Sequence, residues 1–129
     1  MPRLCVMKVL LIDDDDALAS VYSTGLAKED ISVTVAPNGQ EGINKLKAGG
    51  FDLVLLDQVL PDISGTEVLK EIKGTEGIKD IPVVILSNFG QEELVKQAID
   101  IGAVEYIFKY QVEIDDVAKK IKEILNKGE

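Results

Sequence analysis

Carboxylates follow two apolar segments of this sequence at the point where each segment ends. The run Val9–Ile12 is followed by Asp13 and Asp14. The run Leu53–Leu56 is followed by Asp57. Carboxylates gathered at one place repel one another, because each ionised group raises the cost of ionising its neighbour. A hard cation such as Mg2+ relieves that repulsion through carboxylate oxygens, so these acids are a candidate Mg2+ site.

Two further apolar segments end in a hydroxyl and an amine. Ser87 follows Val83–Leu86, and Lys109 follows Tyr106–Phe108. Acids, a hydroxyl and an amine at the ends of buried strands indicate phosphoryl transfer, which needs a nucleophile, a metal and donors to the phosphoryl oxygens. Simpler explanations compete with this one. Asp13–Asp16 would favour the positive start of a helix, Ser87 would form a turn, and Lys109 would be a surface lysine.

The segments that must position these residues alternate between strand and helix patterns. Apolar or β-branched runs predict strands at Lys8–Ile12, Ile31–Val35, Leu53–Leu56, Val83–Leu86 and Tyr106–Phe108. Apolar residues at helical spacing predict a helix after each strand. The second helix is expected at about Gly39–Ala48. The apolar residues that mark the other four helices are Leu18, Val21, Tyr22 and Leu26; Val68, Leu69 and Ile72; Leu94, Val95, Ala98 and Ile101; and Val117, Ala118, Ile121, Ile124 and Leu125.

Capping residues mark several of the helix boundaries. Asn38 is a good N-cap for the helix at Gly39–Ala48. Ser64 and Glu67 have the spacing of a capping box, and Gly102 ends the fourth helix. Five strands alternating with five helices predict an α/β fold, a parallel sheet with helices on both faces. Ligands bind beyond the carboxyl ends of such strands, so the polar residues above are expected to meet there.

Composition limits the classes of function. The chain has 129 residues, which fits one domain. The net charge of −9 argues against direct binding of nucleic acid or an anionic membrane. The group Lys119, Lys120 and Lys122 is interpreted as a solvated helix face. Cys5 is the single cysteine, which excludes an internal disulfide. No segment has the length of a membrane span or the pattern of a signal peptide, so we expect a cytoplasmic protein.

The combination of these residues resembles a response-regulator receiver domain over nearly the whole chain. The resemblance rests on Leu11–Asp14, Asp57 with Pro61 and Gly65, Ser87, Gly102–Ala103, Tyr106 and Lys109. It implies a flavodoxin-like (βα)5 fold with a five-stranded parallel sheet of order 2-1-3-4-5. It also implies a single receiver domain over residues 1–129, with a core at about 8–127 and no output domain.

The resemblance implies a metal-assisted phosphoacceptor site. Asp57 would accept the phosphoryl group as an aspartyl phosphate. Asp14 would bind Mg2+ directly, with Asp13 nearby or acting through water. Asp57 and the backbone carbonyl of Val59 would complete the protein's ligands to the Mg2+ cofactor.

The resemblance also implies roles for three residues around the phosphoryl group. Lys109 would neutralise charge on the phosphoryl oxygens, and Ser87 would donate a hydrogen bond to one of them. Tyr106 would be a rotamer switch that moves inward together with Ser87. The sequence departs from the family pattern at Tyr110, where proline usually follows the lysine in a cis peptide, and at Asn88, where a small residue is usual.

Three functions are compared. The first is a stand-alone receiver that is phosphorylated on Asp57, and the second is a pseudo-receiver that binds partners without phosphorylation. The third is an aspartate-nucleophile hydrolase, which would need a second acid at position 59, where this chain has Val59. We therefore predict a phosphoacceptor signalling domain rather than an enzyme. Dinucleotide binding is weaker still, since no Gly-x-Gly-x-x-Gly follows the first strand.

The resemblance further implies two kinds of protein partner. The chain contains no histidine, so a separate histidine kinase, phosphotransfer protein or small phosphodonor must supply the phosphoryl group. A downstream target would bind the face formed by about Gln91–Ile101, Tyr106–Phe108 and Asp115–Asn126. A homodimer is kept as a candidate assembly. Val59 and Phe89 would flank the line of an attacking water, and their apolar side chains predict slow self-dephosphorylation.

Overall fold

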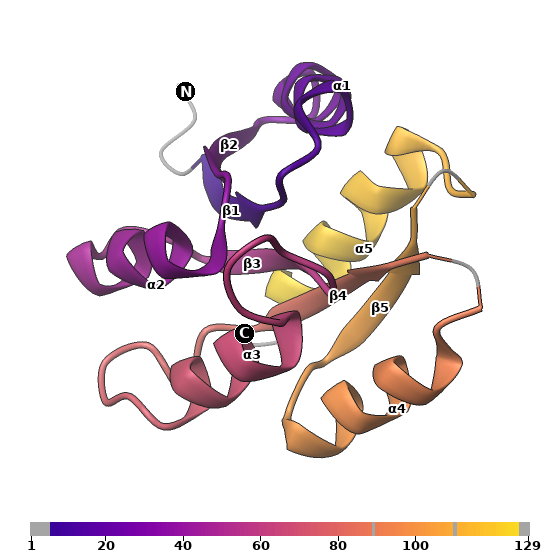
Figure 1. The fold of residues 1–129 in the computed structure, drawn as a ribbon. Helices are drawn as coiled ribbons and strands as arrows, with labels where there is room; N and C mark the ends of the chain where they lie inside the picture. The colour runs from indigo at the N-terminus through magenta and orange to yellow at the C-terminus, as the bar shows by residue number, and fades with distance from the viewer. Residues whose placement is uncertain (1–5, 89, 110, 127–129) are drawn as a thin grey trace.

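Five strands alternate with five helices in this computed structural model, which describes residues 6–88, 90–109 and 111–126 (Figure 1). The strands are β1 (Met7–Ile12), β2 (Ile31–Ala36), β3 (Leu53–Asp57), β4 (Val83–Ser87) and β5 (Glu105–Phe108). The helices are α1 (Asp16–Ala27), α2 (Gly39–Ala48), α3 (Gly65–Lys73), α4 (Glu92–Ile101) and α5 (Ile114–Asn126). Each strand is one residue longer than predicted, so that Asp57 and Ser87 are the last residues of their strands.

The strands form one parallel sheet in the order β2-β1-β3-β4-β5, which confirms the predicted topology. In the register, Asp57 lies opposite Leu86 and Ser87 lies opposite Phe108. The carboxyl ends of parallel strands meet at the same edge of a sheet. The residues at the ends of β1, β3, β4 and β5 are therefore brought together by the backbone alone.

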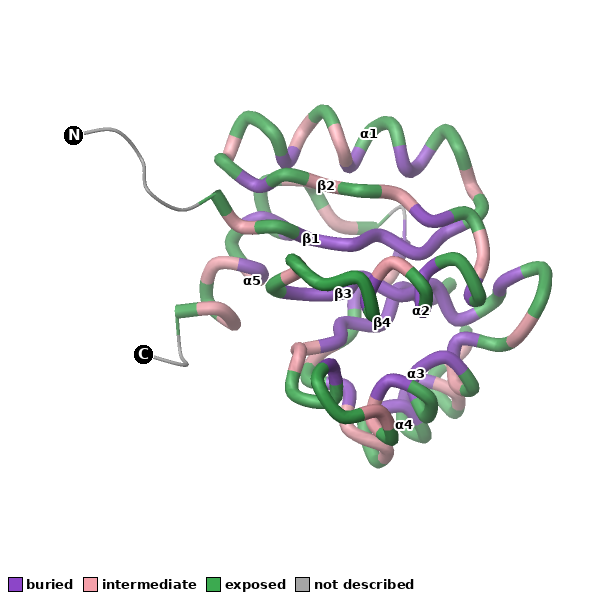
Figure 2. The backbone as a smooth tube through the Cα atoms, turned by 90° about the vertical axis from the view of Figure 1, so that its left-hand side faces the viewer, coloured by how far each residue is buried: buried purple, intermediate pink, exposed green. Residues whose placement is uncertain are grey.

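Apolar side chains fill both faces of the sheet, and Figure 2 shows the central strands as buried along most of their length. Along β1, Leu10 and Ile12 belong to one core and Val9 and Leu11 to the other, as strand alternation requires. The first core includes side chains from α2, α3 and α4, and the second includes side chains from α1 and α5. Burying each Leu or Ile stabilises the fold by about 1.5–3 kcal/mol, so the sheet edge with the polar residues stands on a rigid platform.

Side-chain caps begin the first three helices. Asn38 Oδ1 accepts a hydrogen bond from the backbone N–H of Glu41 at 2.9 Å, as predicted for α2. Ser64 and Glu67 form the predicted capping box at the start of α3. For α1 the cap is Asp15, whose Oδ1 accepts from the N–H of Leu18 at 3.1 Å. Asp15 as the cap and Asp16 in the first turn are thus accounted for by the helix, whereas Asp13 and Asp14 precede it.

One predicted core residue of α1 is wrong. Val21 was expected on the buried face, but it is 56% exposed. The buried residues of α1 are Leu18, Ala19, Tyr22 and Leu26. At 3.6 residues per turn Val21 falls roughly 60° outside the arc that these four occupy. None of the helices in the described ranges is long and apolar enough to cross a membrane.

Candidate functional site

Three carboxylates gather at the carboxyl edge of the sheet. Asp13 and Asp14 follow β1, and Asp57 ends β3. One carboxylate oxygen from each lies within 4.8 Å of the others. Asp13 and Asp57 are buried, whereas Asp14 is exposed at the surface. The prediction that these acids meet is confirmed, and carboxylate oxygens are the ligands that a hard divalent cation takes.

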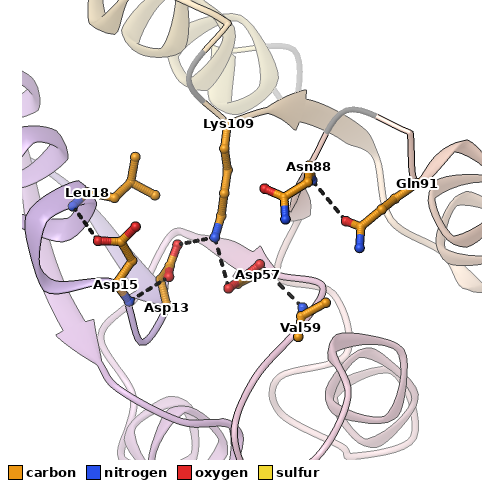
Figure 3. Close-up of polar contacts among 8 residues, drawn as sticks. All are labelled: Asp13, Asp15, Leu18, Asp57, Val59, Asn88, Gln91 and Lys109. Carbon is orange, nitrogen blue, oxygen red and sulfur yellow. Dashed lines mark hydrogen bonds and ion pairs between the residues drawn. The ribbon is translucent and has the colours of Figure 1, made fainter.

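Lys109 lies between two of the acids (Figure 3). Its Nζ atom is 3.0 Å from Oδ2 of Asp57 and 3.2 Å from Oδ2 of Asp13. The Lys109 side chain is buried, and its backbone N–H donates to the carbonyl of Ser87 at 2.8 Å. That bond fixes the start of the lysine side chain at the end of β5. The Lys109–Tyr110 peptide, whose cis or trans state the sequence left open, lies outside the described residues.

The pKa of Asp57 is raised from 3.8 to about 6. Burial is the largest cause, and the nearby charge of Asp13 adds to it, while Lys109 and the N–H of Val59 act in the opposite direction. One of the three acids thus has a raised pKa, and loss of hydration exceeds charge repulsion as its cause. Burial opposes the charged form of Lys109 as well, yet its contacts with Asp57 and Asp13 outweigh burial and raise the pKa of the amine.

Ser87 ends β4 with a fully buried side chain. Its hydroxyl oxygen has no hydrogen-bond partner among the residues that the structure describes. A buried polar group left without a partner costs about 1–3 kcal/mol. The hydroxyl is therefore able to donate to an acceptor that enters the site.

The segment after Asp57 is held tightly against the start of α3. The backbone N–H of Gly65 donates to the carbonyl of Gln58 at 2.8 Å. A Cβ atom at Gly65 would lie 2.5 Å from the Asp57 carbonyl oxygen, so a larger residue would displace the acid. Gln58 is buried and donates from Nε2 to Thr66 Oγ1 at 2.7 Å. This buried amide was not predicted, because nothing in the sequence marks Gln58 as buried.

A second contact that fixes this loop, made by Asp62, was also not predicted from the sequence. Asp62 accepts hydrogen bonds from the backbone N–H groups of Gly39 and Gln40, each at 2.9 Å. Both hydrogen bonds lower the pKa of Asp62, and the bond from Gln40 has the larger effect. The loop that follows the phosphoacceptor candidate is thereby tied to the start of α2. The spacing of more than twenty residues leaves no local signal from which this contact could be predicted.

A cavity of about 380 Å³ opens beside the acids. Its lining consists of Asp14, Asp15, Asp57, Val59, Leu60, Pro61, Asn88 and Lys109. The side chain of Val59 is 55% exposed there, and its backbone N–H donates to Oδ1 of Asp57 at 3.3 Å. Asn88 lies at the surface, on the other side of Asp57 from Asp13 and Asp15 (Figure 3). Phe89 lies outside the described residues.

The candidate switch residue lies outside this cavity. The ring of Tyr106 is 38% exposed and packs edge-on against Phe108, with ring centres 5.1 Å apart. Both rings line a groove of about 310 Å³ between β5 and α4, together with Val95 and Ile99. Tyr106 therefore belongs to the predicted partner face, and its inward movement stays a prediction.

Residues 9–122 match the model of the family described as response regulator receiver domain. The chain belongs to this family. Receiver domains are signalling domains of two-component response regulators, and they interact with histidine kinases and downstream effectors. Receiver domains generally bind Mg2+ at an acidic pocket, and this receiver domain has a cluster of three carboxylates.

Individual relatives agree with this assignment. The receiver domain is 34% identical over 120 residues to the uncharacterized transcriptional regulatory protein YkoG of Bacillus subtilis, covering 93% of this chain and 51% of that protein. It is 36% identical over 103 residues to the cell cycle response regulator CtrA of Brucella ovis, covering 80% of this chain and 44% of that protein. The chain thus spans about half the length of the curated relatives that it matches.

Solved structures agree in fold along the whole domain. A CheY-like response regulator receiver domain protein from Methanospirillum hungatei is 29% identical, with a TM-score of 0.87. The alignment covers 95% of this chain and 96% of that one. A receiver domain protein from Clostridium thermocellum is 27% identical with a TM-score of 0.85, covering 95% and 96% of the two chains. The similarity therefore includes the sheet edge on which the acids lie.

Proposed function

We propose that this receiver domain accepts a phosphoryl group on Asp57 in the presence of Mg2+ and thereby switches a protein-binding surface. The observation that carries the proposal is the contact of Lys109 with Asp57 and Asp13 beside a third carboxylate, that of Asp14. A nucleophile, a cation and a set of metal-binding oxygens are then within reach of one phosphoryl group. These are the parts that phosphoryl transfer needs.

The transfer is a displacement at phosphorus. One carboxylate oxygen of Asp57 attacks in line with the bond to the donor's leaving group. The new oxygen–phosphorus bond forms as the bond to the donor breaks, and the leaving group keeps the electron pair. Because the pKa of Asp57 is about 6, the carboxylate is mostly ionised at neutral pH and can act as the nucleophile.

The residues around Asp57 stabilise the negative charge that develops on the phosphoryl oxygens. The amine of Lys109 follows the negative charge from the carboxylate to a phosphoryl oxygen, and the buried hydroxyl of Ser87 donates to another. Asp13, Asp14, Asp57 and the backbone carbonyl of Val59 are the proposed ligands of Mg2+. Bound Mg2+ supplies further positive charge against the phosphoryl oxygens.

The output surface is the face formed by α4, β5 and α5. The groove between α4 and β5 is lined by Tyr106, Phe108 and Ile99, together with charged residues of α4. Ile99 and Tyr106 are both exposed and line this one groove, and neighbouring exposed apolar side chains are a candidate binding site. We propose that Ser87 moves toward the phosphoryl group and that Tyr106 turns inward, changing this groove for a downstream protein.

The donor is a separate molecule. The chain has no histidine, so a histidine kinase, a phosphotransfer protein or a small phosphodonor supplies the phosphoryl group. Action without an attached output domain, a cytoplasmic location and homodimerisation stay predictions from the sequence. A pseudo-receiver that is never phosphorylated is the competing function, and it would give the buried Ser87 hydroxyl no phosphoryl acceptor.

Incubation with a small phosphodonor, with and without Mg2+, tests the proposal. Intact mass should rise by one phosphoryl group in the parent with Mg2+ and should not rise in Asp57→Asn. Asp16→Asn is the matched control, because Asp16 is an exposed acid in the first turn of α1 outside the carboxylate cluster. An unmodified parent, or equal modification of Asp57→Asn, would favour the pseudo-receiver.

A further inference from the structure

The backbone N–H of Asn88 is held by a side chain from the start of α4. It donates to Oε1 of Gln91 at 2.9 Å (Figure 3). Asn88 directly follows the last residue of β4, and Gln91 directly precedes α4. The hydrogen bond therefore ties the end of the strand beside the site to the start of the helix on the output face.

Strand geometry places this N–H on the side of Asp57. The carbonyl of Leu86 accepts from the N–H of Gln58 at 3.0 Å, so the polar groups of Leu86 face the end of β3. Backbone groups two residues apart in a parallel strand face the same neighbour. Asn88 is the first residue after β4 and has the same parity as Leu86, so we infer that its N–H is directed to the β3 side; Asn88 and Asp57 also line the same cavity.

Two neighbouring hydrogen-bond donors at the end of β4 therefore differ in whether an acceptor is bound to them. The Ser87 hydroxyl is buried and has no hydrogen-bond partner in the described part of the chain. The next donor along the backbone, the N–H of Asn88, is engaged by Gln91. A phosphoryl group has three strong acceptor oxygens, enough to take both donors at once.

Gln91 does not serve the helix that it precedes. It occupies the N-cap position of α4, yet its side chain makes no cap hydrogen bond there. Glutamine is also not a residue that caps helices well. The carboxamide oxygen is instead committed to Asn88, which lies beside the site.

We propose that Gln91 is a latch for the unphosphorylated state. Its carboxamide oxygen occupies the Asn88 N–H that an oxygen of phosphorylated Asp57 takes over, and phosphorylation thereby releases the start of α4 from the end of β4. The latch rests on the proposed phosphorylation of Asp57, whose regulation it describes. Breaking one neutral hydrogen bond weakens binding of the phosphoryl group on the order of fivefold.

The hydrogen bond between Asn88 and Gln91 in the unphosphorylated protein is tested without any phosphoryl group. In the ¹H–¹⁵N spectrum of the unmodified protein, Gln91→Ala should move the Asn88 amide proton upfield, because it loses its acceptor. Gln91→Glu keeps an oxygen acceptor and should restore the downfield position. Gln97→Ala is the matched control, because Gln97 is an exposed glutamine of the same helix. An Asn88 amide that does not respond to Gln91→Ala overturns the latch.

Competition between Gln91 and the phosphoryl group for the Asn88 N–H is tested with beryllium fluoride and Mg2+, a stable analogue of the phosphoryl group. Gln91→Ala should bind the analogue on the order of fivefold more tightly than the parent, and Gln97→Ala should equal the parent. In the bound state the Asn88 amide should have the same shift in the parent and in Gln91→Ala.

The outcomes separate the two proposals. A parent that binds the analogue as tightly as Gln91→Ala overturns the latch and leaves the phosphoacceptor function in place. A parent that binds no analogue contradicts the phosphoacceptor function, and the latch with it.

Discussion

The Nζ atom of Lys109 lies 3.0 Å from Oδ2 of Asp57. This contact joins the end of β5 to the end of β3 across the intervening strand β4. It gives the buried carboxylate a counter-charge in the unphosphorylated state. It also places the amine where charge would appear on a phosphoryl group attached to Asp57.

Removal of that amine should expose the repulsion between the two buried acids. Lys109→Met should raise the pKa of Asp57 above its parent value and lower the free energy of unfolding by about 3 kcal/mol at pH 8 without Mg2+. Urea unfolding measures the loss. Lys120→Met is the control, since its pair with Glu105 is partly exposed and worth less than about 1 kcal/mol. Equal losses in the two variants would contradict the assigned role of the buried contact.

Stability should fall as pH rises through the titration of Asp57. The folded pKa of about 6 lies above the value of 3.8 for an unperturbed Asp, so the folded state holds the proton more tightly. The free energy of unfolding should therefore decrease between about pH 4 and pH 6, by at most about 3 kcal/mol without metal. Asp57→Asn removes this titration and should be more stable than the parent at pH 7. The same slope in both proteins, measured by urea unfolding, would assign the titration to another group.

Mg2+ should stabilise the folded protein, because the unfolded chain lacks the gathered acids. At a Mg2+ concentration tenfold above the dissociation constant, linkage adds about 1.4 kcal/mol, a rise of several degrees in unfolding temperature. Asp14→Asn should lose most of this rise and Asp16→Asn should keep it, since Asp16 lies outside the cluster. A parent unfolding temperature that millimolar Mg2+ does not change would contradict a metal site here.

The loop after Asp57 should depend on Asp62 for its position. Asp62→Ala removes two hydrogen bonds to the start of α2 and should cost up to about 1 kcal/mol of stability. The contribution should fade in acid, because the pKa of Asp62 is lowered in the fold and the bonded carboxylate is lost when it protonates. Asp80→Ala, at an exposed acid of the loop before β4, is the control. Thermal unfolding at pH 7 and at pH 3 compares the three proteins, and a loss that persists unchanged at pH 3 would count against the carboxylate.

The phosphorylated form should be long-lived. Val59 lies beside Asp57 and offers an attacking water no side-chain hydrogen bond. Val59→Asn, combined with Phe89→Glu, should shorten the lifetime several-fold, as followed by loss of the phosphorylated mass. The single variant Val59→Asn shows how much of the change in lifetime comes from position 59 rather than from Phe89. Decay of the double variant at the parent's rate would contradict this account of the lifetime.

The sequence by itself determined the order and type of the elements, because apolar runs and helical spacing are local signals. Asp13, Asp14, Asp57, Ser87 and Lys109 were placed at strand ends from these runs alone. The parallel sheet then follows from the alternation of strands and helices, and parallel strands end at one edge. The caps at Asn38 and Ser64 were predictable for the same reason, since a cap acts over three residues.

The tertiary structure decided which side chains touch and how deeply they are buried. Three contacts depend on how the elements are oriented relative to one another, which the periodicity of the sequence does not reveal. They are the contacts of Lys109 with two acids, of Asp62 with α2, and of Gln91 with Asn88. Val21 was misplaced because an apolar residue at the border of a helix face is buried only if a neighbouring element covers it. The pKa of Asp57 follows from burial more than from its neighbours' charge. Burial is a property of the packed chain, and no local pattern of residues determines it.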